Sequence, residues 1–285
     1  VVSIGTTLPE VMVSATSALT GHGEIAYGNA IGSIICNTAL IAAITVAVRP
    51  GPVDTKALKT PVLFFFGSAA IYVVNTYVTG YFGRPLGILL LAIFVVYLVV
   101  TVRQGFRNPV EAAAEEEGTK EIEEKATKNT MGKDILLLVV GAALVAVGAD
   151  LLVDNGTLIA QALGVPESVI ALTFVALGTS LPELVTAITS LAKGHGALSL
   201  GNVIGANLFN LVLVSGMSMT LAPFYIPESS TLFGVNASLV LDIPLMLFVM
   251  AFLTLPALKT RNLSRYQGIV LLILYAAFCG IQFTM

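Results

Sequence analysis

Long apolar runs separated by short polar stretches dominate the chain. Runs such as residues 85–102 and 135–149 approach the roughly 20 apolar residues that a helix needs to cross a bilayer. A helix also satisfies its own backbone hydrogen bonds in lipid, whereas a β-barrel strand would show alternating polarity that these runs lack. The pattern therefore predicts nine helical segments, at residues 1–20, 25–48, 61–79, 85–103, 134–153, 167–192, 198–222, 236–257 and 266–285.

Composition supports a membrane protein and excludes other classes. Apolar residues make up 56% of the 285 positions, charged residues make up 11%, and the mean hydropathy is +0.92, whereas a soluble domain carries about a quarter charged residues. The net charge of −3 and the lack of a basic patch with interleaved aromatics argue against a nucleic-acid partner. Cys36 and Cys279 lie within apolar runs and have no disulfide or zinc spacing.

The basic residues orient the predicted spans. With alternate loops on opposite sides, every Lys and Arg except Arg84 falls on one side, which the positive-inside rule assigns to the cytoplasm. The acidic stretch at residues 104–133 lies on that side and is interpreted as a solvated cytoplasmic linker, with a regulatory cation-binding segment as the alternative. We expect a multi-pass protein of the plasma membrane, in contact with the lipid bilayer.

An internal repeat organises the chain. GTTLPEVMVSATSALTGHGEIAYGNAIGSIICN, which begins at Gly5, aligns without gaps on GTSLPELVTAITSLAKGHGALSLGNVIGANLFN, which begins at Gly178. Five predicted spans separate the two copies, so the matched helices cross the membrane in opposite directions. RPLGILLL from Arg84 likewise resembles RYQGIVLL from Arg265. Inverted repeats around a site at mid-membrane are typical of secondary transporters.

The repeat predicts the fold class and the domain organisation. We expect an all-α integral membrane fold of two inverted five-helix repeats, residues 1–103 and 134–285, joined by the linker at 104–133. Judged against its partner, the first repeat lacks its opening helix. The native protein is therefore expected to have ten helices, against about nine here, and to be roughly 40 residues longer. A naturally shortened first half is the alternative.

Two matched glutamates carry the candidate chemistry. A carboxylate at mid-membrane costs roughly 2.5–3.5 kcal/mol even on permissive insertion scales, so Glu10 and Glu183 need a compensating partner. Pro9 and Pro182 precede them and are expected to break each helix, which frees backbone carbonyls. The candidate metal ligands around the carboxylates are the carbonyl and hydroxyl oxygens of Thr6, Thr7, Thr179 and Ser180.

The partner segments add further oxygen ligands. Asn29, Ser33 and Asn37 are spaced by four and share one helical face, as do Asn202, Ala206 and Asn210 in the second copy. Ser33, Asn37 and Asn210 complete the candidate set. An all-oxygen set suits a hard cation, and calcium takes about 6–8 such ligands. We expect transported cations rather than a resident cofactor, since no His or Cys is placed for a soft metal.

Three other polar residues have less direct interpretations. His22 and His195 occupy the matched GHG turns and are interpreted as turn residues, with a pH sensor as the alternative. Asp242 is a third acid within an apolar span, but it has no matched partner in the other repeat. We interpret it as interfacial or structural.

The paired motifs GTSLPE and GNVIGANLFN, with their inverted copy, resemble the two α-repeats of the sodium/calcium exchanger family, within the wider cation/calcium antiporters. The resemblance implies a ten-helix fold that exchanges three sodium ions for one calcium ion through one pocket. It also implies that Glu10 and Glu183 ligate both ions, with the Thr6 and Thr179 carbonyls at the calcium site. Thr7, Ser180 and Ser33 would serve sodium, and Asn37 and Asn210 would complete the central position.

Two departures from the family pattern leave the driving ion open. Ala206 stands where the family often has Ser, and Asn210 stands where some relatives have Asp. The calcium/proton branch is a poorer match, because it typically carries Glu where this chain has Gly32–Ser33 and Gly205–Ala206. We expect antiport by alternating access. Proton/calcium antiport is the alternative, and a cation channel or an intramembrane enzyme is less favoured, because inverted broken helices belong to carriers and no nucleophile–base arrangement is seen.

Overall fold

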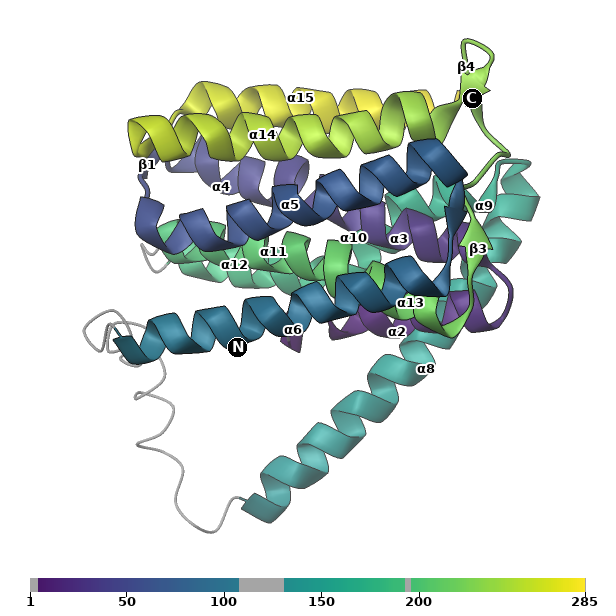
Figure 1. Cartoon of the computed structure of the whole chain (residues 1–285), viewed down its shortest axis with the longest axis horizontal. Helices are drawn as coiled ribbons and strands as arrows, with labels where there is room; N and C mark the ends of the chain where they lie inside the picture. The colour runs from purple at the N-terminus through teal and green to yellow at the C-terminus, as the bar shows by residue number, and fades with distance from the viewer. Residues whose placement is uncertain (1–4, 108–130, 193–195, 285) are drawn as a thin grey trace.

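The computed structural model describes residues 5–107, 131–192 and 196–284, and most of it is helical (Figure 1). Six described helices are long and apolar enough to cross a membrane, and a seventh span is formed by a helix pair bent by 120°. The predicted linker at 104–133 falls largely outside the described residues. Helix α6 continues to Arg107 and helix α8 begins at Met131, so each helix extends a few residues into this range.

The first half contains three of these spans, preceded by the shorter helix α2. The first span is continuous from Gly23 to Val48 and includes a π-helical stretch. Two short strands interrupt the connections between helices. The elements are α2 (Leu8–Leu19), α3 (Gly23–Cys36), η1 (Asn37–Ala42), α4 (Ala43–Val48), β1 (Gly51–Pro52), α5 (Thr55–Thr79), β2 (Tyr81–Phe82) and α6 (Arg84–Arg107).

The second half repeats this order after an additional long helix. The elements are α8 (Met131–Leu163), α9 (Glu167–Ile170), η2 (Ala171–Val175), α10 (Ala176–Thr179), α11 (Leu181–Ala192), α12 (Gly196–Phe209), η3 (Asn210–Val214), α13 (Ser215–Leu221), β3 (Phe224–Tyr225), β4 (Thr231–Leu232), β5 (Val235–Asn236), η4 (Ser238–Asp242), α14 (Ile243–Thr260), β6 (Asn262–Leu263) and α15 (Arg265–Gln282).

One predicted boundary differs from the structure for an identifiable reason. The third segment was expected to begin at residue 61, but α5 begins at Thr55, because the Asp54 carboxylate caps the helix by accepting from the backbone N–H groups of Lys56 and Ala57. The segment at 167–192 is broken at Ser180, within the GTSLPE motif where a break was expected. Pro182 cannot donate a backbone hydrogen bond, so the helix ends and starts again there.

The inverted repeat extends to the short strands. The offset of 173 residues that relates Glu10 to Glu183 also relates β1 to β3, and the offset of 181 that relates Arg84 to Arg265 relates β2 to β6. β1 pairs with β6, and β2 pairs with β3. The two pairs are thus equivalent, and they lie at opposite ends of the molecule (Figure 1). The π-helical stretches η1 and η3 are related by the same offset of 173.

Close helix packing obeys the same symmetry. A Cβ atom on Gly87 of α6 would lie 2.8 Å from the carbonyl oxygen of Gly216 in α13, and one on Gly268 of α15 would lie 2.7 Å from that of Ala43 in α4. Only glycine permits this approach. The match between RPLGILLL and RYQGIVLL therefore reflects one helix contact made twice.

The buried apolar side chains form one large cluster and one small one. The large cluster joins α3 to α6 with α12 to α15. The small cluster contains Val13 and Ile25 from α2 and α3, Val153 and Ala160 from α8, and side chains of the segment that follows α9. α8 therefore packs on the body of the protein through a separate and smaller contact, and it diverges from the other helices in Figure 1.

Candidate cation-binding site

Helices α2 and α11 place the two glutamates. Each helix begins just before a proline, and Glu10 and Glu183 both lie in the first turn. The predicted helix breaks at GTTLPE and GTSLPE are confirmed. The first turn of a helix has unsatisfied N–H groups and a favourable dipole for a carboxylate.

Both carboxylates are inside the protein. Glu10 is 0% exposed and Glu183 is 5% exposed. They come from opposite repeats and lie near enough to interact electrostatically. No Lys, Arg or His among the described side chains forms an ion pair with either. Two buried like charges without a cationic partner need a bound cation or protons.

Glu10 is held by groups from both repeats. The Ser180 hydroxyl donates to Glu10 Oε1 at 3.2 Å, and the Asn29 amide donates to the backbone carbonyl of Glu10 at 3.1 Å and to Ser14 Oγ at 2.8 Å. Thr179 in turn donates to Asn29 Oδ1 at 2.9 Å. Asn29 therefore connects the helix start that carries Glu10 to the break that precedes Glu183.

Several buried polar atoms around the glutamates have no hydrogen-bond partner among the described residues. They are Glu10 Oε2, both carboxylate oxygens of Glu183, and the side-chain amide atoms of Asn37 and Asn210. The Thr6 side chain lies close enough to Glu183 to interact with it, although the contact falls short of hydrogen-bond geometry. Unsatisfied buried oxygens are rare in folded proteins and indicate an unrecorded ligand such as an ion.

Asn37 and Asn210 occupy matched positions, and each lies on an element that packs against the glutamate helix of the other repeat. Asn37 is the first residue of η1 and Asn210 is the first residue of η3. η1 packs against α11, the helix of Glu183, and η3 packs against α2, the helix of Glu10. A π-helical turn interrupts the regular hydrogen-bond ladder and is frequent at functional sites.

The remaining predicted ligands lie on the same elements. Thr7 and Thr179 are buried at the two helix breaks, and Ser33 Oγ lies 3.5 Å from Thr179 Oγ1. Thr6 is half-buried. The described residues hold no group of three or more His, Cys, Asp or Glu side chains that could bind a metal. The candidate site thus combines two carboxylates with neutral oxygens.

Sequence reasoning missed the contacts of Asn29 and did not single out Asn207. Asn29 was placed on the right helical face, but its partners belong to other helices and leave no trace in the local pattern. Asn207 is fully buried and donates to Thr38 Oγ1 at 2.7 Å and to the sulfur of Met250 at 3.1 Å. No signal in the sequence pointed to this contact, because Asn207 has Ile34 at its matched position.

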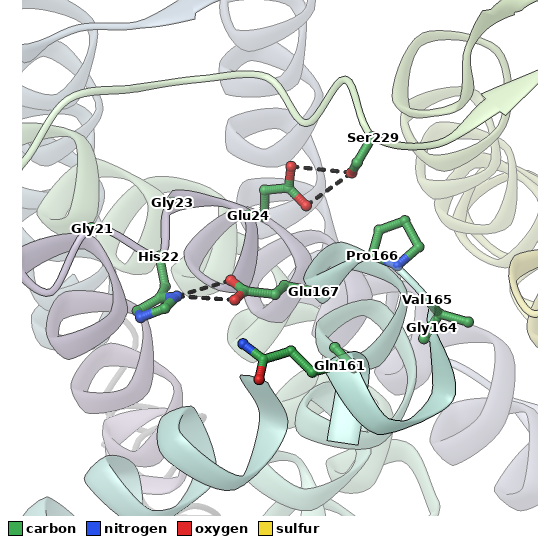
Figure 2. Close-up of a pocket in the computed structure, with 11 residues that line it drawn as sticks. Gly21, His22, Gly23, Glu24, Gln161, Gly164, Val165, Pro166, Glu167 and Ser229 are labelled. Carbon is green, nitrogen blue, oxygen red and sulfur yellow. Dashed lines mark hydrogen bonds and ion pairs between the residues drawn. The ribbon is translucent and has the colours of Figure 1, made fainter. Parts of the chain in front are cut away.

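A surface pocket of about 530 Å³ lies away from these carboxylates, beside the turn from α2 to α3 (Figure 2). Figure 2 shows His22 facing Glu167, with Nδ1 2.9 Å from Oε2, and Glu24 facing Ser229, whose hydroxyl donates to it at 2.9 Å. His22 is therefore a turn residue that also forms an ion pair when protonated. His195, its matched residue, lies outside the described ranges.

Comparison with known proteins identifies relatives over nearly the whole chain. The family model described as "Sodium/calcium exchanger protein" matches residues 1–103 and 133–284. An uncharacterized membrane protein of Methanocaldococcus jannaschii is 33% identical over 96% of this chain and 82% of its own length. The inner membrane protein YrbG of Escherichia coli is 36% identical over 78% of this chain and 68% of its own.

A solved structure supports the same relationship. The sodium-calcium exchanger NCX_Mj, soaked with Na⁺ and Sr²⁺, superposes with a TM-score of 0.66 at 29% identity, and the match covers 97% of this chain and 83% of that one. The predicted all-α membrane fold is confirmed, and the family is one of transporters rather than an enzyme class. This chain belongs to the sodium/calcium exchanger family of membrane antiporters.

Proposed function

We propose that this protein exchanges sodium for calcium across the membrane at the pocket between Glu10 and Glu183. The observation that carries the proposal is the pair of buried carboxylates, one from each inverted repeat, with no cationic partner among the described side chains. Two carboxylates neutralise one divalent ion. Sodium ions that occupy the same oxygens compete with calcium, and this competition produces exchange rather than leak.

The proposed ligands are the residues predicted from the sequence. Calcium takes about 6–8 oxygens in adaptable geometry, and the unsatisfied oxygens of Glu10, Glu183, Asn37 and Asn210 supply part of that number. The hydroxyl and carbonyl oxygens at the two helix breaks supply the remainder. These belong to Thr6, Thr7, Thr179 and Ser180, with Ser33 from α3.

Sodium is favoured over the proton as the driving ion by the make-up of this pocket. Hydroxyl groups of Thr7, Ser33 and Ser180 are neutral oxygens that suit a monovalent hard cation. The positions 32–33 and 205–206 carry no additional carboxylate that would take up a proton. NCX_Mj, whose fold this chain shares, is a sodium-calcium exchanger. Proton/calcium antiport on the same fold is the second candidate.

Alternating access would be produced by movement of α8 against the rest of the protein. α8 packs on the body through the small cluster around Val13 and Val153, separate from the main core. Much of its described surface is apolar and exposed, including Leu144, Val147 and Leu158. Among the described side chains, the contacts of α8 with the body are apolar and include no ion pair, so movement along them breaks no charged interaction.

The proposed setting is the plasma membrane, with residues 104–133 in the cytoplasm. The positive-inside distribution of Lys and Arg supports this orientation. The relative YrbG carries the name of an inner membrane protein, which agrees with the placement.

The test is uptake of calcium-45 into proteoliposomes that contain the native full-length protein and are loaded with sodium or with choline. We expect uptake to require internal sodium and to be lost in Glu183→Gln. Glu24→Gln is the matched control, because it removes a partly exposed carboxylate that bonds Ser229 outside the site.

The outcomes separate the candidates. Uptake that ignores sodium but follows a proton gradient would replace sodium by protons as the driving ion. Uptake that persists in Glu183→Gln would remove the glutamate pair from the mechanism. Flux that neither saturates nor needs a counter-ion would indicate a channel.

A further inference from the structure

Asp242 is the third acid within an apolar span, and the proposed ion pocket does not use it. It ends the π-helical stretch η4, at the start of α14, and is 2% exposed. It was interpreted as interfacial or structural, and its burial among helices favours the structural alternative. A carboxylate at such a place is costly unless it is paired with a cation or is neutral.

The neighbours of Asp242 come from three elements and are polar but uncharged. Gln282 of α15 lies with Nε2 2.6 Å from Asp242 Oδ1. Ser238 of η4 and Tyr27 of α3 lie near the carboxyl group, and the buried Tyr27 hydroxyl has no hydrogen-bond partner among the described residues. The titratable groups that face this cluster are Tyr27 and, from α5, Tyr72 and Tyr77. No described Lys, Arg or His forms an ion pair with Asp242.

We propose that Asp242, together with Tyr27, Ser238 and Gln282, forms a proton-binding site separate from the ion pocket, and that Asp242 is a carboxylic acid in this conformation. The ligand is a single proton, held on a carboxyl oxygen. The proposal concerns a group outside the pocket of Glu10 and Glu183 and stands whether sodium or protons drive exchange.

The contact with Gln282 is compatible with the neutral form. The Gln282 amide lies against Asp242 Oδ1, with Nε2 as the donor. The same amide turned by half a revolution would place Oε1 there and accept the proton of a carboxylic acid. Gln282 can therefore serve either protonation state, and the burial of Asp242 without a described cationic partner favours the neutral acid.

The environment also excludes the other way of neutralising the charge. A sodium ion would need several oxygens around it, whereas Asp242 Oδ1 is in direct contact with the Gln282 amide in a buried cluster. Tyr27 is fully enclosed, and its ring stacks on Phe82 at a centroid distance of 6.0 Å. A proton bound to a carboxyl oxygen needs no additional room.

The experiment is infrared spectroscopy of the full protein in nanodiscs, with all aspartates carrying ¹³C in the side-chain carboxyl group. The chain has only five aspartates, at positions 54, 134, 150, 154 and 242. We expect a carboxylic acid C=O band at neutral pH that shifts with the isotope and disappears in Asp242→Asn. Asp54→Asn is the matched control, because Asp54 is an exposed helix cap, and it should leave the band unchanged.

A second variant keeps the result decisive if Asp242→Asn does not fold. Gln282→Leu should retain the acid band but move it to higher frequency, because the proton loses its acceptor. No isotope-sensitive acid band in the parent protein would overturn the proposal, as would a band that survives in Asp242→Asn. Neither infrared measurement depends on transport, so the proton-site proposal and the proposed exchange function can be refuted independently.

Discussion

The two glutamates occupy matched positions in sequence but different surroundings in space. Glu10 accepts from Ser180, and its backbone carbonyl accepts from Asn29. Both carboxylate oxygens of Glu183 lack a hydrogen-bond partner among the described residues. The helix packing is also tighter in the first repeat than in the second. A Cβ atom on Gly28 would lie 2.5 Å from that of Ala171, whereas one on the matched Gly201 would have no described atom within 4 Å.

The difference teaches that a symmetric sequence motif need not produce a symmetric site. The half around Glu10 is fixed by contacts with the other repeat. Around Glu183, both carboxylate oxygens lack a described hydrogen-bond partner, and no described atom covers the helix face at Gly201. We therefore expect the affinity for a bound cation to depend equally on the two glutamate charges but unequally on the residues that support them. Four sets of substitutions test this, beginning with the largest expected effect.

Neutralising either glutamate should be the most damaging change. At an effective dielectric constant of 20 and a separation of 4 Å, one charge contributes about 4 kcal/mol to the attraction of a cation, so Glu10→Gln and Glu183→Gln should each weaken calcium binding by roughly a thousandfold. Equilibrium binding of calcium-45 to the purified protein measures this. A loss confined to one of the two variants would show that the carboxylates do not share an ion.

Removing the Asn29 side-chain amide should weaken calcium binding more than removing the matched amide of the second repeat. Asn29→Ala removes the hydrogen bonds to the Glu10 carbonyl, to Ser14 and from Thr179. Residues that hydrogen-bond to metal ligands typically contribute about tenfold to hundredfold to metal affinity, so we expect a loss of that size. Asn202→Ala, at the matched and half-buried position, should weaken calcium binding less. Equal losses in the same binding assay would contradict the asymmetry.

The glycine pair tests packing rather than binding. Gly28→Ala should lower stability by about 1–3 kcal/mol because of overpacking against Ala171. Gly201→Ala should instead raise it by about 0.5–1 kcal/mol, because alanine loses less backbone entropy in a helix. Thermal unfolding in detergent, followed by intrinsic tyrosine fluorescence, distinguishes the two signs. Destabilisation by both would mean that the face of Gly201 is filled.

The smallest expected effect concerns sodium. Ser33 in the first repeat is matched by Ala206 in the second, which is buried. Ala206→Ser would restore a second hydroxyl, and a hydrogen-bonding group of this kind contributes about 1 kcal/mol. We expect sodium to drive calcium uptake at about fivefold lower concentration. An unchanged sodium dependence, with uptake otherwise normal, would place position 206 outside the ion path.

The sequence predicted what the repeat encodes directly. The matched motifs predicted that both glutamates lie inside the protein, that the helices break at the prolines beside them, and that the helix order repeats in the second half. It could not predict the contacts of Asn29 with Thr179 or of Asp242 with Gln282, because each joins residues far apart in the chain. Hydropathy also underestimated α5 and α8, since the ends of long helices that leave the apolar zone carry polar residues such as Asp54 and Lys56.

The paired strands have a consequence for how the protein matures. β1 and β2 belong to the first half, but β1 pairs with β6 and β2 pairs with β3, both from the second. The backbone groups of the first half in these loops therefore stay unpaired while the ribosome is still making the second half. β1 cannot pair until residues 262 and 263 of β6 have been made. A ribosome that stalls before residue 262 therefore leaves this link between the two halves unformed.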